Sequence, residues 1–202
     1  MKRMGLFGGS FNPIHNGHLH LVQSVQQALS LEGVLLMPTG EAPHKSSAAY
    51  ASAEDRLAMC RLAAEPFPWL SVSAYETRRI GKSYTVETLR YLTAQYPDAE
   101  WTLMIGSDML LTLDKWREWK EITKMANICA VSRNTGDNAE LQAYAETLMQ
   151  QADGAEITVL PVEALELSST EIREKLQNRE DTSCLLPENV VQYIEMHRLY
   201  QS

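Results

Sequence analysis

The sequence has few of the features that mark membrane, secreted or disulfide-linked proteins. No apolar run approaches the roughly 18 residues of a membrane-spanning helix, and Lys2 and Arg3 lead into an apolar stretch too short for a signal peptide. The 3 cysteines, Cys60, Cys129 and Cys184, are odd in number and far apart. That spacing fits neither a disulfide framework nor a zinc knuckle. We therefore expect a cytoplasmic protein with free thiols, and we expect Cys129 in a core strand.

Positive charge is also scarce. The chain has 18 Lys and Arg against 26 Asp and Glu, which gives a formal net charge of −8. This balance argues against a protein that coats nucleic acid, because such binding neutralises many phosphates with Lys and Arg. A small anionic ligand is compatible with it but needs a local basic pocket. The candidates for that pocket lie mostly in or beside loops: His15, His18, His44, Lys45, Arg133 and Arg173.

The apolar pattern predicts one α/β domain over residues 1–202. Apolar content is 45%, enough for a sizeable core. Runs of strand length near 4–7, 34–37, 70–73, 101–105, 127–131 and 156–160 alternate with segments of helical period. This alternation predicts a doubly wound parallel sheet, in which ligands bind at the carboxyl ends of the strands.

The segment from Gly8 to His18 follows the first of these strands and leads into a helix. Gly8 and Gly9 let backbone N–H groups approach an anion, Asn16 is a predicted N-cap, and a helix start favours phosphate. His15 and His18 add donors at the same end. An ordinary strand-to-helix turn is the alternative for the glycines. A metal site with His20 is disfavoured, because residues two apart on a helix point to different faces.

The tetrapeptide His15-Asn16-Gly17-His18 resembles the signature of the nucleotidylyltransferase superfamily. Further matches follow along the chain: Pro43-His44-Lys45, Ser83-Tyr84-Thr85, Ile105-Gly106-Ser107-Asp108, Lys115-Trp116 and Leu167-Ser168-Ser169-Thr170-Glu171-Ile172-Arg173. Together they resemble the bacterial nicotinate-nucleotide adenylyltransferase family. The resemblance implies a Rossmann-like nucleotidylyltransferase fold. It departs at Asn12, where many members carry Asp, so we assign that position no catalytic role.

The resemblance implies transfer of the adenylyl group of ATP to nicotinate mononucleotide, which gives nicotinate adenine dinucleotide and pyrophosphate in NAD biosynthesis. The implied catalytic residues are His15, His18, Lys45 and Arg173. The implied ATP-binding residues are Gly8, Gly9, Ser10, Phe11, His15, His18, Gly106, Asp108, Arg133, Ser169, Thr170 and Arg173. For nicotinate mononucleotide they are Lys45, Tyr84, Thr85 and Trp116. We expect Mg²⁺ to arrive with ATP, held by phosphate oxygens and water rather than by protein ligands.

Some of these residues have plainer interpretations that stay open from sequence alone. Asp108 can cap the helix that follows it, and the segment from Ser168 to Glu171 can be simple helix capping. Trp116 can be a core residue, as we expect Trp119 to be. The loop 38–51, rich in Pro, Gly, Ser and Ala, is a candidate flap.

Other functions are also open. Pantetheine-phosphate, cytidylyl and nicotinamide-mononucleotide transferases share the histidine signature, and a catalytically silent nucleotide sensor is an alternative of another class. The sequence leaves oligomeric state undecided.

Overall fold

The protein is described by a computed structural model that covers residues 1–40, 50–132, 138–163, 165 and 167–201. Within these residues six strands form one parallel sheet: β1 (Lys2–Gly9), β2 (Gly33–Pro38), β3 (Leu70–Val72), β4 (Ala99–Gly106), β5 (Ala126–Ser132) and β6 (Ile157–Pro161). All six lie where the apolar runs predict them. Each run is recognisable because a parallel sheet covered on both faces buries nearly every residue of a central strand.

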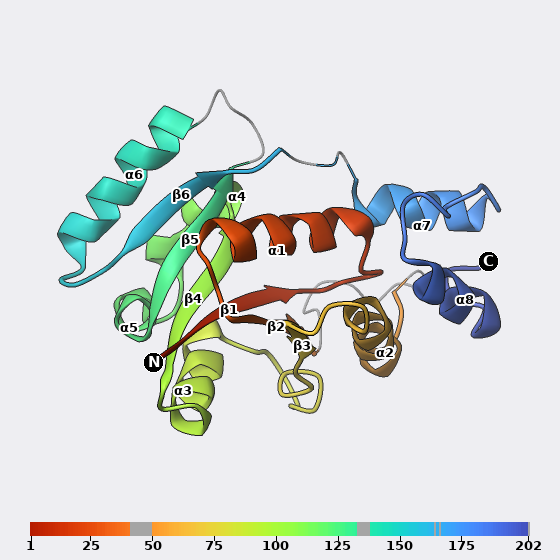
Figure 1. Cartoon of the computed structure of the whole chain (residues 1–202), viewed down its shortest axis with the longest axis horizontal. Coiled ribbons are helices and arrows are strands. Elements are labelled where there is room, and N and C mark those ends of the chain that lie inside the picture. Colours follow the sequence, from red (N-terminus) through yellow and green to blue (C-terminus); the bar gives the residue numbers. More distant parts are fainter. Residues whose placement is uncertain (41–49, 133–137, 164, 166, 202) are drawn as a thin grey trace.

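Helices connect the strands and cover both faces of the sheet (Figure 1). They are α1 (Asn16–Ala28), α2 (Ala53–Ala64), α3 (Thr85–Gln95), α4 (Ser107–Leu110), the 3₁₀ helix η1 (Leu113–Lys115), α5 (Trp119–Met125), α6 (Asn138–Gln151), α7 (Ser169–Gln177) and α8 (Glu188–Met196). None of these helices is long and apolar enough to cross a membrane, a statement that covers the described residues only.

Two hydrophobic clusters lie on opposite faces of the sheet. Successive side chains of a strand point to opposite faces, so in β2 Val34 and Leu36 join one cluster and Leu35 and Met37 the other. The first cluster packs the sheet against α1, α2, α7 and α8, and the second packs it against α3, α5 and α6. Cys129 lies in the first cluster and is fully buried in β5, which confirms its predicted place in a core strand.

The strand order is β3-β2-β1-β4-β5-β6. From β1 the chain continues outward to β2, and from β4 it continues outward in the other direction to β5. The two neighbours β1 and β4 therefore form the topological switch point, and their diverging connections leave a crevice at their carboxyl ends. The predicted doubly wound parallel sheet is confirmed. It places the loops after Gly9 and after Gly106 side by side.

Candidate active site

The loop between β1 and α1 ends in an N-cap, and the capping residue is His15. His15 Nδ1 accepts the N–H of His18, and His18 Nδ1 accepts the N–H of His15, both at 3.3 Å. The prediction that Asn16 caps this helix is therefore wrong, because the imidazole of the preceding residue already takes that role. Asn16 is instead the first helical residue. Its N–H donates to the Leu185 carbonyl at 2.9 Å, and its side-chain amide donates to the Cys184 carbonyl at 3.1 Å.

This reciprocal capping sets the chemistry of both histidine rings. A neutral imidazole whose Nδ1 accepts a hydrogen bond carries its proton on Nε2. The rings of His15 and His18 stack with centroids 3.7 Å apart, so two imidazolium charges at that spacing would repel each other strongly. The pair is therefore suited to act as two neutral N–H donors on one helix end.

The conformation of the loop depends on Phe11 more than on the glycines. Phe11 has a φ of 45°, in the left-handed region that costs a residue with a side chain about 1–2 kcal/mol. Its ring lies edge-on to that of His18, with centroids 5.2 Å apart. A Cβ on Gly9 would lie 3.0 Å from the Phe11 ring, so Gly9 makes room for it. Gly8 and Gly9 themselves complete β1, opposite Met37 and Pro38, and neither has a positive φ.

The motif from Leu167 to Arg173 packs directly on the loop between β1 and α1. Ser168 caps α7 and forms a capping box with Glu171, so the capping interpretation of this segment is confirmed. The Ser169 hydroxyl donates to the Pro13 carbonyl at 3.0 Å. Arg173 donates to the Asn12 carbonyl at 2.8 Å and to the Thr170 hydroxyl at 3.2 Å. Two motifs more than 150 residues apart in sequence thus meet at one end of the sheet.

A buried arginine that sequence reasoning did not single out holds the same loop. Arg56 of α2 is 1% exposed and donates to the carbonyls of Ser10, Thr39 and Gly40, each at 2.7 Å, and to that of Ala51 at 3.3 Å. Its described partners thus lie after β1, after β2 and before α2. A signal was present in the sequence: Arg56 shares its helical face with the apolar residues at positions 59, 60 and 63. A charge on that face predicts a buried, hydrogen-bonded role.

The loop after β4 lies beside the histidine loop in the sheet. Gly106 is the N-cap of α4, and Asp108 is exposed at the second position of that helix. Asp108 is therefore not the cap, and that alternative is wrong. A Cβ on Gly106 would lie 2.7 Å from Asp108 Oδ1, so a larger residue at position 106 would displace this carboxylate.

Three of the predicted acceptor residues, Tyr84, Thr85 and Trp116, lie on two segments that contact each other. Tyr84 is the N-cap of α3 and Thr85 its first residue. The guanidinium of Arg117 lies 4.8 Å from the Tyr84 ring centroid and pairs with Glu87 at 3.2 Å, which brings the residue after Trp116 against the start of α3.

Burial alone does not separate the two tryptophans. Trp116 and Trp119 are both half-buried, and both pack against the second core cluster. The expected contrast between a functional Trp116 and a core Trp119 therefore does not appear in their exposure.

Comparison with known proteins decides the family. The family model described as cytidylyltransferase-like matches residues 6–175. A Synechococcus protein named probable nicotinate-nucleotide adenylyltransferase is 40% identical over 201 residues, covering 98% of this chain and 95% of its own. A protein of the same name from Neisseria meningitidis serogroup B is 38% identical over the full length of both chains.

The chain belongs to the nicotinate-nucleotide adenylyltransferase family. The resemblance drawn from its motifs is confirmed. A solved structure of Plasmodium falciparum nicotinic acid mononucleotide adenylyltransferase complexed with APC has a TM-score of 0.76, 15% identity, and coverage of 99% of this chain and 98% of its own. A second structure of that protein, complexed with NaAD, has the same TM-score. At this identity the likeness establishes the fold, and it confirms the expected Rossmann-like nucleotidylyltransferase architecture.

Several residues that the family motifs single out lie outside the described residues. These are His44 and Lys45, with most of the loop 38–51, and Arg133. Their assignments stay predictions.

A buried carboxylate lies behind the predicted acceptor segment. Glu76 accepts the Thr88 hydroxyl at 2.6 Å, and burial raises the pKa of the Glu76 carboxyl. A Cβ on Gly40 would clash with the Glu76 carbonyl oxygen, so only glycine fits where the chain after β2 meets this segment. These contacts fix the loop before α3 relative to β2.

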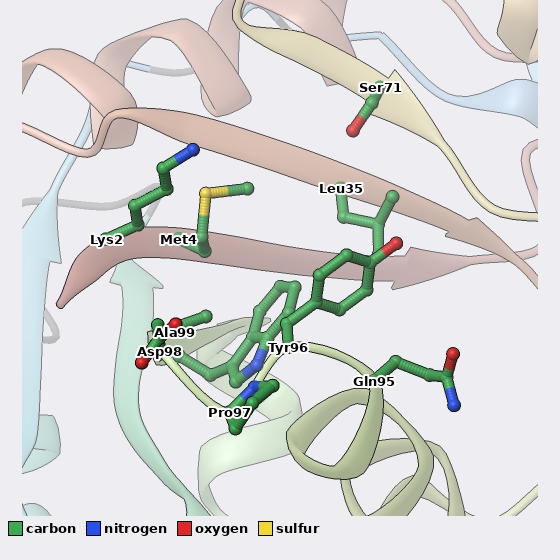
Figure 2. A pocket seen from close by; sticks show the side chains of 10 residues that line it. Lys2, Met4, Leu35, Ser71, Gln95, Tyr96, Pro97, Asp98 and Ala99 are labelled. Carbon is green, nitrogen blue, oxygen red and sulfur yellow. The ribbon is translucent and has the colours of Figure 1, made fainter.

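Two cavities differ in their relation to the motifs. A small cavity of about 20 Å³ is lined by His15, Gly17 and His18 together with Leu165 and Leu167. A larger one of about 400 Å³, shown in Figure 2, lies where β1 and β4 begin and is lined by residues that include Lys2, Tyr96 and Ala99. The larger cavity contains none of the motif residues and opens at the amino ends of these strands. Ligands of doubly wound sheets bind at the opposite edge, so the histidine loop is the candidate active site.

No group of three or more His, Cys, Asp or Glu side chains positioned to hold a metal ion occurs among the residues that the structure describes. His20, the third histidine of the segment, bonds through Nε2 to the Glu163 carbonyl at 2.8 Å. The described donors at the site are N–H groups and a guanidinium, which suit phosphate oxygens better than a metal ion.

Proposed function

We propose that this chain transfers the adenylyl group of ATP to nicotinate mononucleotide, giving nicotinate adenine dinucleotide and pyrophosphate in NAD biosynthesis. The contact that carries the proposal joins Arg173 to the Asn12 carbonyl at 2.8 Å. It brings the motif from Leu167 to Arg173 onto the histidine loop, at the switch point where such sheets bind nucleotides. The curated relatives that match the full chain bear the name of this activity.

The described donors suit the reaction. A phosphate oxygen of the mononucleotide attacks the α-phosphorus of ATP, and the bond from that phosphorus to the bridging oxygen of pyrophosphate breaks. The attacking phosphate is already ionised at neutral pH, so no general base is needed. What the protein must supply is alignment of two anions and stabilisation of charge in the transition state. We assign His15 and His18, as Nε2–H donors, to the α-phosphate region and the leaving phosphates.

Arg173 adds a fixed positive charge beside these donors, and we assign Lys45 to assist from its loop. We assign the remaining ATP contacts to Gly8, Gly9, Ser10, Phe11, Gly106, Asp108, Arg133, Ser169 and Thr170. The hydroxyls of Ser169 and Thr170 already contact Pro13 and Arg173. We therefore propose that these two residues act mainly through backbone N–H groups at the start of α7.

We assign the acceptor to the start of α3 and to Trp116, with Lys45 on its phosphate. The N–H groups and the Thr85 hydroxyl at the helix start favour a carboxylate on the pyridine ring, and Trp116 offers a surface for stacking. The contact of Arg117 with Tyr84 supports this pairing of segments, because it holds the residue after Trp116 against the helix start.

Mg²⁺ fits this site as an ion carried by ATP, because the described donors are N–H groups and an arginine rather than a set of carboxylates. When bound, it would neutralise charge on the phosphates. We propose that residues 1–202 act as one domain. A cytoplasmic location is consistent with an ATP-dependent reaction and with the free cysteines Cys60, Cys129 and Cys184.

An acceptor screen tests the activity. With ATP saturating, we expect pyrophosphate release with nicotinate mononucleotide to exceed that with nicotinamide mononucleotide by on the order of 10²-fold in kcat/KM. Loss of a charged hydrogen bond and an unpaired donor costs the amide roughly 2–4 kcal/mol. Pantetheine phosphate and the acceptor substrates of cytidylyltransferases should give no product. Equal rates with acid and amide would overturn the acceptor assignment, and ATP binding without turnover on any acceptor would favour the sensor alternative.

Matched tryptophan variants test the acceptor pocket itself. Trp116→Ala should raise the KM for nicotinate mononucleotide and leave that for ATP unchanged. Trp119→Ala is the control, because Trp119 is also half-buried against the second cluster. If both variants change the acceptor KM equally, stacking on Trp116 is the wrong explanation.

A further inference from the structure

The chain after α8 turns back and buries a tyrosine against the histidine loop. Arg198 and Tyr200 both have positive φ, 52° and 61°, and the Leu199 N–H bonds to the Ile194 carbonyl at 3.0 Å. This turn leaves Tyr200 only 5% exposed. Its hydroxyl donates to Asn12 Oδ1 at 2.8 Å, across a sequence separation of 188 residues.

Asn12 is the point where several segments meet. It is 1% exposed, and its Oδ1 also accepts the Ala51 N–H at 3.0 Å, while its carbonyl accepts Arg173. The C-terminal turn, the entry to α2 and α7 therefore all bond to one residue of the loop. This network gives the side-chain oxygen of Asn12 a structural use, which depends on its being an acceptor and not on a charge.

The residue next to Asn12 transmits this restraint to the histidines. Phe11 keeps its positive φ only while its neighbours hold the backbone in place. Its ring lies edge-on to His18. A shift of Asn12 therefore moves Phe11, and a shift of Phe11 changes the packing around the His18 ring.

We propose that Tyr200 is a positioning residue for the nucleotide loop: its hydroxyl holds Asn12 so that Phe11 keeps the His18 ring in place for the phosphates of ATP. The inference rests on the proposed adenylyl transfer for its kinetic consequence. Burial raises the pKa of the Tyr200 phenol, so this hydroxyl stays a donor at any physiological pH.

The test compares two tyrosines that differ in where their hydroxyls bond. Tyr200→Phe removes the bond to Asn12 and keeps the buried ring. Tyr193→Phe, in α8, removes a similar bond, from Tyr193 to Asp55 Oδ1 at 2.9 Å, which does not reach the loop. In the full chain we expect Tyr200→Phe to lower kcat/KM for ATP about fivefold, the scale of one neutral hydrogen bond. The KM for nicotinate mononucleotide should not change, and Tyr193→Phe should change neither constant by more than about twofold.

Amide hydrogen exchange supplies a readout that does not depend on turnover. Peptides covering residues 10–18 should exchange faster in Tyr200→Phe than in the parent chain or in Tyr193→Phe, at a temperature where thermal melts show all three folded. Equal exchange in the two variants would overturn the inference. Suppose that residues 10–18 exchange faster in Tyr200→Phe than in the parent chain, but that the parent chain releases no pyrophosphate with any acceptor. The proposed function would then be wrong, while the contact of Tyr200 with the loop would keep its structural role.

Discussion

His15 and His18 keep their places because each ring accepts the other's backbone N–H. One pair of side chains thus caps a helix through Nδ1 and presents donors through Nε2. The sequence His-Asn-Gly-His suits this arrangement because the two histidines are three residues apart, the spacing of an N-cap and the third helical residue. The motif is therefore a local folding signal, and under the proposed function it also supplies donors to the phosphates of ATP.

Substitution of His18 should separate these two roles. His18→Ala should lower kcat by about 10²-fold or more, the scale of one lost transition-state donor, with little effect on the acceptor KM. His18→Asn keeps an acceptor for the His15 N–H but lacks a ring donor at the Nε2 position, so it should be folded and nearly as slow. His20→Ala is the control on the same helix, since His20 bonds to the Glu163 carbonyl. Near-normal turnover of His18→Asn would mean that His18 serves only as a helix cap.

Local sequence identified these histidines but not the full geometry of their loop. Gly8 and Gly9 were assigned to the approach of backbone N–H groups to an anion, and the structure shows that they extend β1 beside β2, whereas the left-handed residue of the loop is Phe11. Asn is a residue type that often caps helices, but His15 lies one residue before Asn16, and its Nδ1 accepts the His18 N–H. The error at Asn16 arises because a reciprocal bond between two side chains and the backbone overrides a single-residue preference.

Helices and strands were predictable to the extent that their burial follows a period. All six strands are apolar runs, and those at the centre of the sheet, such as β2, are covered on both faces. Ser52 begins a Ser-Ala-Glu-Asp sequence that approximates a capping box, and it caps α2. The Asp55 carboxylate of that pattern accepts the Ser52 hydroxyl at 2.7 Å instead of completing the usual reciprocal bond, because Asp is shorter than Glu. The role of Arg56 was not predicted, since its partners are backbone carbonyls on other elements.

Arg56 should be the side chain of α2 on which the stability of the neighbouring loops depends most. Arg56→Met keeps an unbranched apolar chain but leaves buried carbonyls after β1 and β2 without their donor. We expect the free energy of unfolding to fall by roughly 2–4 kcal/mol, measured by urea denaturation. Arg61→Met is the matched control, because Arg61 is exposed on the same helix.

That control should lose less than about 0.5 kcal/mol. Equal losses in the two variants would show that the carbonyls of Ser10, Thr39 and Gly40 find other donors when Arg56 is absent.

Assembly of the site depends on strand order, which no local pattern specifies. The alternation of strands and helices predicts ligands at the carboxyl edge, but only the neighbouring positions of β1 and β4 bring Gly106 beside the histidine loop. The contacts of Asn12 with Arg173 and Tyr200 likewise join residues more than 160 positions apart. The family motifs identify the residues assigned to the site. The hydrogen bonds that hold those residues in place can be found only in the three-dimensional structure.

The three cysteines differ in their burial. Cys60 and Cys129 are fully buried and Cys184 is exposed. Burial raises the pKa of the Cys129 thiol to about 12 and that of Cys60 still further. Because the thiolate is the nucleophile, iodoacetamide at pH 8 should add to one site per native chain and to all three after denaturation, as counted by intact mass.

Cys184→Ser should abolish the rapid addition of iodoacetamide to the native chain. After denaturation, iodoacetamide should add to two sites, Cys60 and Cys129, instead of three. The Cys184 carbonyl accepts the Asn16 amide at the start of α1, but its thiol takes no part in that bond, so turnover should survive the substitution. Rapid addition at Cys60 would contradict the packing of α2 on β2, because this thiol lies in the cluster that joins them. The stoichiometry in the native state therefore tests the packing on that face of the sheet without any reference to the chemistry of the site.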